Sequence, residues 1–231
     1  TQLGDWDSTV QLMYGSYDGE LDAITEKTQG ELNDFAGINW TLAYDWFSVR
    51  AAYLVAETSF ALDGTDPSGA ALNGLEAALR ANSLNTLADD IAINEDDSSF
   101  FGLGFSIDYD NFLFDAEYTQ FEVENSILTE QTQYYASVGY RLDDVIVHFT
   151  YEDNDDKHDA SRFDPIATVP SLNAAINGAL TGVQAQSNVY TIGARYDFHP
   201  SAAFNIDFSR FEDDVTDTET DVVAVGVDLV F

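Results

Sequence analysis

Apolar and polar residues alternate along most of this chain. In the stretch FGLGFSIDY (101–109), every second residue from Phe101 to Tyr109 is apolar, and glycine, serine and aspartate stand between them. A period of two predicts β-strands that have one apolar face. The same alternation predicts ten strands, in the segments 5–17, 37–46, 47–55, 101–109, 112–119, 134–142, 145–151, 190–198, 203–209 and 221–231.

The connections between these strands are of two kinds. Short turns are predicted at Asp45-Trp46, Asp110-Asn111, Asp143-Asp144 and His199-Pro200-Ser201. Long polar loops are predicted at 18–34, 58–98, 122–131, 152–187 and 212–221. Because short and long connections take turns, all the short ones fall at one end of an up-and-down antiparallel sheet. Helical spacing of apolar residues also predicts helices within 69–92 and 171–180, and no linker divides the single domain 1–231.

The apolar faces must be covered either by lipid or by a second protein layer. A soluble antiparallel sandwich also has alternating strands, so it is the alternative to a membrane barrel. The apolar faces carry no charge at mid-strand, where a charge in lipid costs about 2–4 kcal/mol. Aromatic residues gather at the strand ends, which is typical of the two membrane interfaces. The turn-end set is Trp46, Phe47, Tyr109, Phe112, Phe198 and Phe231, and the loop-end set is Tyr14, Phe60, Phe101, Tyr134, Tyr151 and Tyr190. These features favour a transmembrane antiparallel up-and-down β-barrel, an all-β fold.

The net charge is −34, from 42 acidic and 8 basic residues. Nucleic-acid binding needs a cationic surface, so this composition argues against it. The chain has no cysteine and no run of eighteen apolar residues. There is no initiating methionine and no leader, so we expect a processed chain or part of a longer one.

Two segments carry a resemblance to a known family. The closing strand DVVAVGVDLVF (221–231), with Val227, Leu229 and a final Phe231, resembles the sorting signal of outer-membrane barrels. The stretch YTIGARYDFHPSAAFNIDFSRFEDD (190–214) resembles the next-to-last hairpin of Gram-negative porins. The resemblance implies an outer-membrane porin of the general trimeric type, delivered by the barrel-assembly machinery and surrounded by lipid and lipopolysaccharide. Such porins usually have sixteen strands, so this chain is either a complete ten-strand barrel or, as we favour, the C-terminal part of a larger one.

A porin works through the width and charge of its lumen. The polar faces carry three arginines close to the short turns, together with several acids, and we expect these residues to line the pore. They are Arg50, Arg141, Arg195, Asp45, Asp108, Asp115, Glu117, His148, Asp207 and Asp228. The arginines could be wall residues tied to nearby carboxylates, or they could set up a transverse field that orients solutes. With acidic loops around the mouth, we expect a weakly cation-selective channel for ions and small hydrophilic solutes.

Acidic runs in the loops raise the question of bound Ca²⁺ or Mg²⁺, because these ions take clustered carboxylate oxygens. The candidate ligands are Asp153, Asp155, Asp156, Asp213, Asp214 and Asp217. None of the runs has the spacing of a calcium-binding loop, so a solvated exterior is the simpler interpretation.

An enzyme and a closed barrel are the other functional classes. Ten-stranded outer-membrane proteases use Asp–Asp and Asp–His pairs, which Asp156-Lys157-His158 with Asp96-Asp97 or Asp213-Asp214 could imitate. His148 and His199 have no evident nucleophile partner, and no Gly-x-Ser-x-Gly motif occurs. We therefore expect no enzyme. A structural or adhesin barrel with a filled lumen is the third class.

Overall fold

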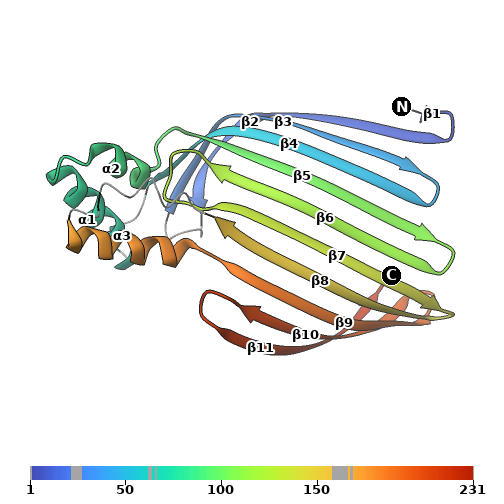
Figure 1. Ribbon diagram of the computed structural model, residues 1–231. Coiled ribbons are helices and arrows are strands. Elements are labelled where there is room, and N and C mark those ends of the chain that lie inside the picture. Colours follow the sequence, from blue (N-terminus) through green and yellow to red (C-terminus); the bar gives the residue numbers. More distant parts are fainter. Residues whose placement is uncertain are drawn as a thin grey trace.

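The computed structural model describes residues 2–21, 28–61, 64–65, 67–157, 166 and 169–230, and it contains one antiparallel sheet. Eleven strands lie side by side in chain order, from β1 to β11 (Figure 1). The strands are β1 (Gln2–Leu3), β2 (Trp6–Leu21), β3 (Thr28–Tyr44), β4 (Phe47–Ala61), β5 (Asp96–Tyr109), β6 (Phe112–Val123), β7 (Glu130–Leu142), β8 (Val145–Lys157), β9 (Gln186–His199), β10 (Ala202–Asp213) and β11 (Thr218–Leu229). Apart from the two-residue β1, these are the ten strands that the alternation predicts, and they form the wall of an up-and-down β-barrel.

The short turns lie at one edge of the sheet, which we call the turn end. Asp45, Asp110 and Asp143 each open a two-residue turn with φ of 38°, 52° and 53°. Hairpins of this length need a left-handed residue at this position so that the turn follows the twist of the strands. Aspartate tolerates that conformation better than most residues because its short side chain can hydrogen-bond locally.

The opposite edge, the loop end, differs from the prediction in one respect. The strands continue into the segments predicted as loops 18–34, 58–98, 122–131, 152–187 and 212–221, so that β8 runs to Lys157 and β3 begins at Thr28. Alternation of apolar residues stops earlier, but antiparallel pairing needs only backbone groups and continues with polar side chains. Acidic residues such as Glu31, Asp97 and Asp155 therefore lie on strands that extend beyond the apolar band.

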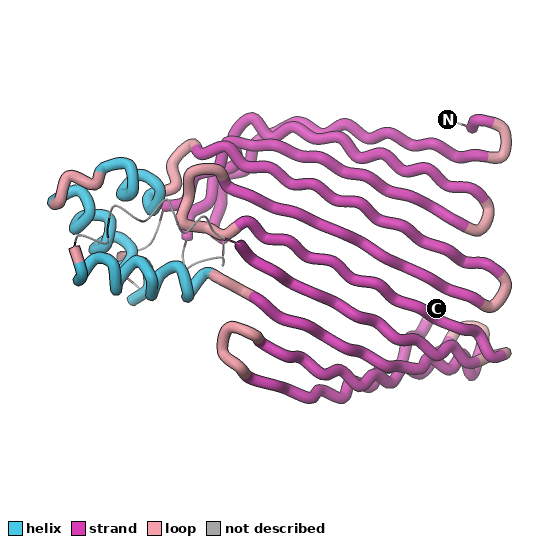
Figure 2. Tube along the Cα trace, in the orientation of Figure 1, coloured by secondary structure: helices cyan, strands magenta, loops and turns pink. Residues whose placement is uncertain are grey.

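Three helices occupy the loop end, beyond the outer ends of the strands (Figures 1 and 2). The predicted helix within 69–92 is two helices, α1 (Pro67–Ala81) and α2 (Asn85–Ala92). They are separated at Ser83, whose φ of 61° is incompatible with a continuous helix. The helix predicted at 171–180 is α3 (Pro170–Val183). None of the helices in the described ranges has the length and apolar character needed to cross a membrane.

The helices pack around a common apolar core that we call the cap. Leu79 and Ile176 are fully buried at its centre. The core also holds Leu75, Leu87, Ala88, Ile91, Ile93, Val123, Ile127, Ile166, Leu172 and Leu180. Val123 belongs to β6, and Phe60 of β4 and Phe121 of β6 pack against the same core. The cap therefore rests directly on the sheet.

Aromatic rings form two belts on the apolar face. At the turn end, Trp6 lies 4.9 Å from Tyr44 and 5.3 Å from Phe47, measured between ring centroids. At the loop end, the Tyr151 ring lies 5.1 Å from that of Tyr190. Phe60 was predicted for the loop-end belt, but it belongs to the cap, because strand alternation turns it to the other face of β4.

Candidate functional site

The face opposite the aromatic belts carries the polar side chains, and we call it the polar face. The strand registers place nearly all the predicted pore-lining residues on it. These are Arg50, Asp108, Asp115, Glu117, Arg141, His148, Arg195, Asp207 and Asp228. Asp45 is the exception and its prediction was wrong, because the turn needs its positive φ and it lies exposed between β3 and β4. Phe60, Phe121 and Val123 share the polar face, so the cap stands on that side of the wall.

Arg50 does not pair with Asp45 but reaches over a neighbouring strand. Its Nη2 lies 2.9 Å from both carboxylate oxygens of Glu117 on β6. Gly104 of β5 stands between them in register with both. A Cβ at Gly104 would touch the Arg50 side chain at 3.9 Å, so the glycine gives this side chain its path across β5.

His148 and Asp207 repeat this arrangement on β8 and β10. His148 Nε2 lies 3.0 Å from Asp207 Oδ1, and Gly193 of β9 is in register with both residues. A side chain at Gly193 would overlap both partners. The contact is an ion pair when the imidazole is protonated and a neutral hydrogen bond otherwise.

The other two arginines are also tied to carboxylates. Arg141 donates from Nη1 and Nη2 to the two oxygens of Asp108, at 2.6 and 2.7 Å. Arg195 donates from Nε to Asp197 at 2.9 Å and from Nη1 to Asp228 at 2.8 Å. Fork-to-carboxylate pairs of this kind hold both groups in one orientation. All three predicted arginines thus lie near the turn end with their charge paired.

Hydroxyl groups fill the next row of the polar face toward the loop end. Ser106 donates to Asp115 at 2.6 Å. Ser137 and Thr150 share a hydrogen bond of 2.8 Å, and Thr191 and Ser209 share another of 2.8 Å. This row is satisfied within the wall.

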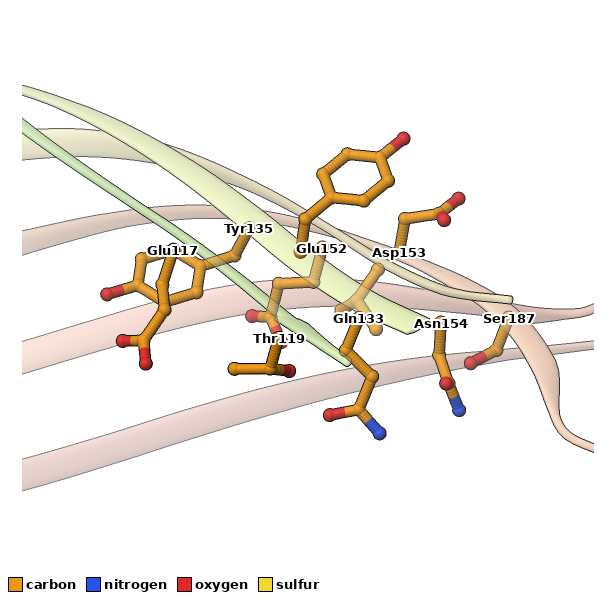
Figure 3. Close-up of a pocket in the computed structure, with 10 residues that line it drawn as sticks. Glu117, Thr119, Gln133, Tyr135, Glu152, Asp153, Asn154 and Ser187 are labelled. Carbon is orange, nitrogen blue, oxygen red and sulfur yellow. The ribbon is translucent and has the colours of Figure 1, made fainter. Parts of the chain in front are cut away.

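A polar groove of about 360 Å³ lies above that row, between the hydroxyl groups and the loop end (Figure 3). It is lined by Glu117, Thr119, Gln133, Tyr134, Tyr135, Glu152, Asp153, Asn154, Ser187 and Val189. Except for Glu117, the prediction missed these residues. Each one looks like an ordinary strand residue in the sequence, and only the pairing of β6, β7, β8 and β9 brings them together.

The predicted metal ligands are engaged in other bonds. Asp153 accepts a hydrogen bond from Tyr151, and Asp214 accepts one from Asn188. Asp213 accepts the backbone N–H groups of Val215 and Thr216 in the β10–β11 turn, and Asp217 lies in that turn with a φ of 51°. In the described ranges, no three His, Cys, Asp or Glu side chains come together as a metal site. Cation binding at these loops stays a prediction.

Two neighbouring acids at the outer end of β8 differ in their titration. Asp156 is 3% exposed and accepts hydrogen bonds from the Ala185 backbone N–H and the Thr129 hydroxyl, which tie the end of α3 to the wall. Burial raises the pKa of the Asp156 carboxyl above its usual value. The ammonium group of Lys157 lowers the pKa of Asp155 through a hydrogen bond.

The remaining predicted residues have these positions. Val227 and Leu229 of β11 are exposed on the apolar face, whereas Phe231 and His158 lie outside the described residues. Without His158, the described part of the predicted protease pair is Asp156, which is buried under the cap. His199 Nδ1 lies 3.0 Å from Ser201 Oγ, a partner that the prediction missed. The same nitrogen accepts the Ser201 backbone N–H, so this is a turn contact between residues two apart.

Comparison with solved structures supports the fold. The outer membrane channel DcaP of Acinetobacter baumannii has a TM-score of 0.50 and 12% identity, over 92% of this chain and 60% of that one. OmpT of Vibrio cholerae has a TM-score of 0.49 and 13% identity, over 93% of this chain and 63% of that one. A structure described as KdgM porin has a TM-score of 0.38 and 9% identity, over 98% and 99%. The chain thus spans less than two thirds of the length of the first two structures.

Comparison with curated proteins finds no match. The family model described as Gram-negative porin matches residues 2–228, nearly the whole chain. This match agrees with a wall of antiparallel strands that has an apolar face with two aromatic belts and a polar face with paired charges. The protein is an outer-membrane β-barrel, and the chain belongs to the Gram-negative porin family.

Proposed function

We propose that this protein forms a water-filled channel for the passive diffusion of ions and small hydrophilic solutes. The observation that carries the proposal is the polar face, on which charged and hydroxyl side chains continue from strand to strand. Enclosed in a cylinder, such a surface would border water, whereas the opposite face meets hydrocarbon. Planar-bilayer recordings test it directly, and a purified protein that gives no steps of conductance would contradict it.

We further propose that the ten long strands are part of a larger closed barrel. Within the described ranges, β11 pairs only with β10, and the outer edge of β2 meets only the two-residue β1. Unpaired backbone groups cannot remain exposed to hydrocarbon, so the free edges need additional strands or each other. The greater length of the two structural neighbours agrees with additional strands.

The charge of the polar face supports a weak preference for cations. Each of the three arginines is held by a carboxylate, which cancels much of its field beyond a few ångströms. Glu152 has no ion-pair partner among the described residues, and the loop-end strands are acidic. Uncompensated acids at a mouth concentrate cations and repel anions, and salt screens this effect over about 10 Å at 0.1 M.

Replacing Arg50→Ala is expected to increase cation preference, because it removes the positive charge that neutralises Glu117. We expect the potassium-to-chloride permeability ratio to rise about twofold in dilute salt, measured as a shift in reversal potential across a KCl gradient. Arg210→Ala is the matched control, since Arg210 pairs with Asp221 and alternation places it on the apolar face of β10. An equal shift in both variants, or a shift that persists in 1 M salt, would contradict this account.

The other two functional classes lead to different measurements. We infer that the chain is not an enzyme, because a membrane-facing wall with paired lumenal charges needs no nucleophile, and the His199–Ser201 contact stays within one turn. A closed structural or adhesin barrel would leave the lumen filled by side chains. Liposomes carrying the protein would then fail to swell in isosmotic sugar, whereas an open channel lets the sugar enter.

We also propose that the protein is a homotrimer embedded in lipid and lipopolysaccharide, and that the barrel-assembly machinery recognises its last strand. Val223, Val225 and Val227 of that strand are 57–67% exposed on the apolar face, as a lipid-facing surface requires. An unheated gel sample of the native protein should migrate as a species about three times the mass of the heated one. Migration at the mass of one chain in both samples would count against the trimer.

A further inference from the structure

The polar groove on β6 to β9 has an ordered composition. In the row nearer the turn end, Glu117, Tyr135 and Glu152 are directly opposite one another across β6, β7 and β8. In the next row outward, Gln133, Asn154 and Ser187 are opposite one another across β7, β8 and β9. Neighbours within a row stand about 4.8 Å apart, the spacing of paired strands. An aromatic ring thus lies between two carboxylates, beside a row of neutral hydrogen-bonding groups (Figure 3).

These groups differ from the rest of the polar face in having hydrogen-bonding capacity left over. Glu152 has no ion-pair partner in the part of the chain that the structure describes, and Tyr135 is 36% exposed. Asn154 Oδ1 is buried and accepts no hydrogen bond from the described residues. By contrast, the row nearer the turn end is satisfied by hydroxyl–hydroxyl and hydroxyl–carboxylate bonds.

The composition of the groove restricts what it can hold. Two carboxylates, with Arg50 bound to only one of them, disfavour an anion. A divalent metal ion needs several oxygen ligands together, and the described residues contain no such group. An organic ammonium group is less strongly hydrated than a metal ion, and it is attracted both by a tyrosine ring and by a carboxylate.

We propose that this groove binds small organic cations during their passage through the channel. The ammonium group lies against the Tyr135 ring between Glu117 and Glu152, and the polar remainder of the solute hydrogen-bonds to Gln133, Asn154 and Ser187. The inference rests on the proposed channel function, because the solute reaches the groove through the lumen. It also adds to that function, since a wall site makes the passage of these solutes saturable.

The test uses choline as the cation and 3,3-dimethyl-1-butanol, its neutral isostere, as the matched control ligand. In planar bilayers, choline on the loop-end side should produce concentration-dependent current fluctuations, and the isostere should not. Glu152→Gln should weaken choline binding about tenfold, and Tyr135→Leu several-fold, whereas Tyr135→Phe keeps the ring and should change it less than about twofold. Glu122→Gln removes the same charge from the opposite face of β6 and should have no effect.

Calorimetry of the detergent-solubilised protein with choline gives a second measurement that needs no current. If the wild-type protein conducts but choline neither blocks nor binds, the groove proposal is wrong and the channel stands. If choline binds in the calorimeter while no conductance is seen, the channel proposal is wrong and the groove stands. Equal effects of choline and its isostere, or of Glu152→Gln and Glu122→Gln, would overturn the assignment of an organic cation to this site.

Discussion

Ile192→Arg is expected to lower the free energy of unfolding in lipid bilayers by about 2–4 kcal/mol, the cost of a cationic side chain at the middle of a lipid-facing strand. Ile192 lies near the centre of β9 and is 61% exposed. Its neighbours across the strands are Phe149 and Phe208, which share the apolar face. Because the isoleucine fills no internal space, its replacement leaves little cavity, and the loss measures the surroundings of the face directly.

Thr191→Arg is the control, since Thr191 precedes Ile192 and points to the polar face. It forfeits one hydroxyl contact with Ser209, so we expect a loss of at most about 1 kcal/mol. Chemical denaturation in vesicles, followed by tryptophan fluorescence, supplies both values. If Ile192→Arg is neutral while the protein stays monodisperse without detergent, the apolar face meets water, and the membrane interpretation fails.

The strand pattern could be predicted because lipid and water impose alternation one residue at a time. Ten strands, their shared apolar face and the turns at Asp45, Asp110 and Asp143 all follow from neighbouring residues in the chain. The ends of the strands could not be predicted in the same way. Backbone pairing continues through acidic segments such as 152–157 after the side-chain pattern has ended.

The partners of the charged residues depend on register, which the sequence does not display. The arginine at position 50 could be placed on the polar face, but its partner Glu117 lies two strands away and 67 residues later. The glycines at 104 and 193 are the local signal that was missed, because each opens a path between groups on the strands at either side. The groove around Tyr135 was missed for the same reason, since its members meet only through the pairing of four strands.

The cap was predicted only in part. Helical spacing indicated both helical segments, but it did not show that they share one core or that this core rests on Phe60 and Phe121. Those two contacts place the cap on the polar face, at the loop end of the lumen. The segment 58–98 was expected to be the best candidate for folding into the lumen, whereas its two helices lie beyond the strand ends.

Leu79→Ala is expected to destabilise the cap by about 2–5 kcal/mol, the usual cost of removing a fully buried leucine side chain. Leu79 lies at the centre of the core, with no exposed surface, among Leu75, Leu87 and Ile176. Helical units this small have little stability in reserve, so the cap should loosen while the paired strands stay folded. Because the cap stands on the polar face, we expect larger and noisier single-channel currents from this variant.

Trypsin offers a second measurement of the same change, because Arg80 is the only lysine or arginine in the segment 58–98. In the folded cap, this side chain is held at 2.9 Å by both Glu76 and Asp89 in or beside helical turns. Loosening of α1 should release it, so mass spectrometry should detect faster cleavage into fragments 1–80 and 81–231. Leu103→Ala makes the same chemical change on the apolar face of β5 and should leave both the cleavage rate and the current noise unchanged. Rapid cleavage at Arg80 in the unmodified protein would mean that the three helices do not hold together over the lumen.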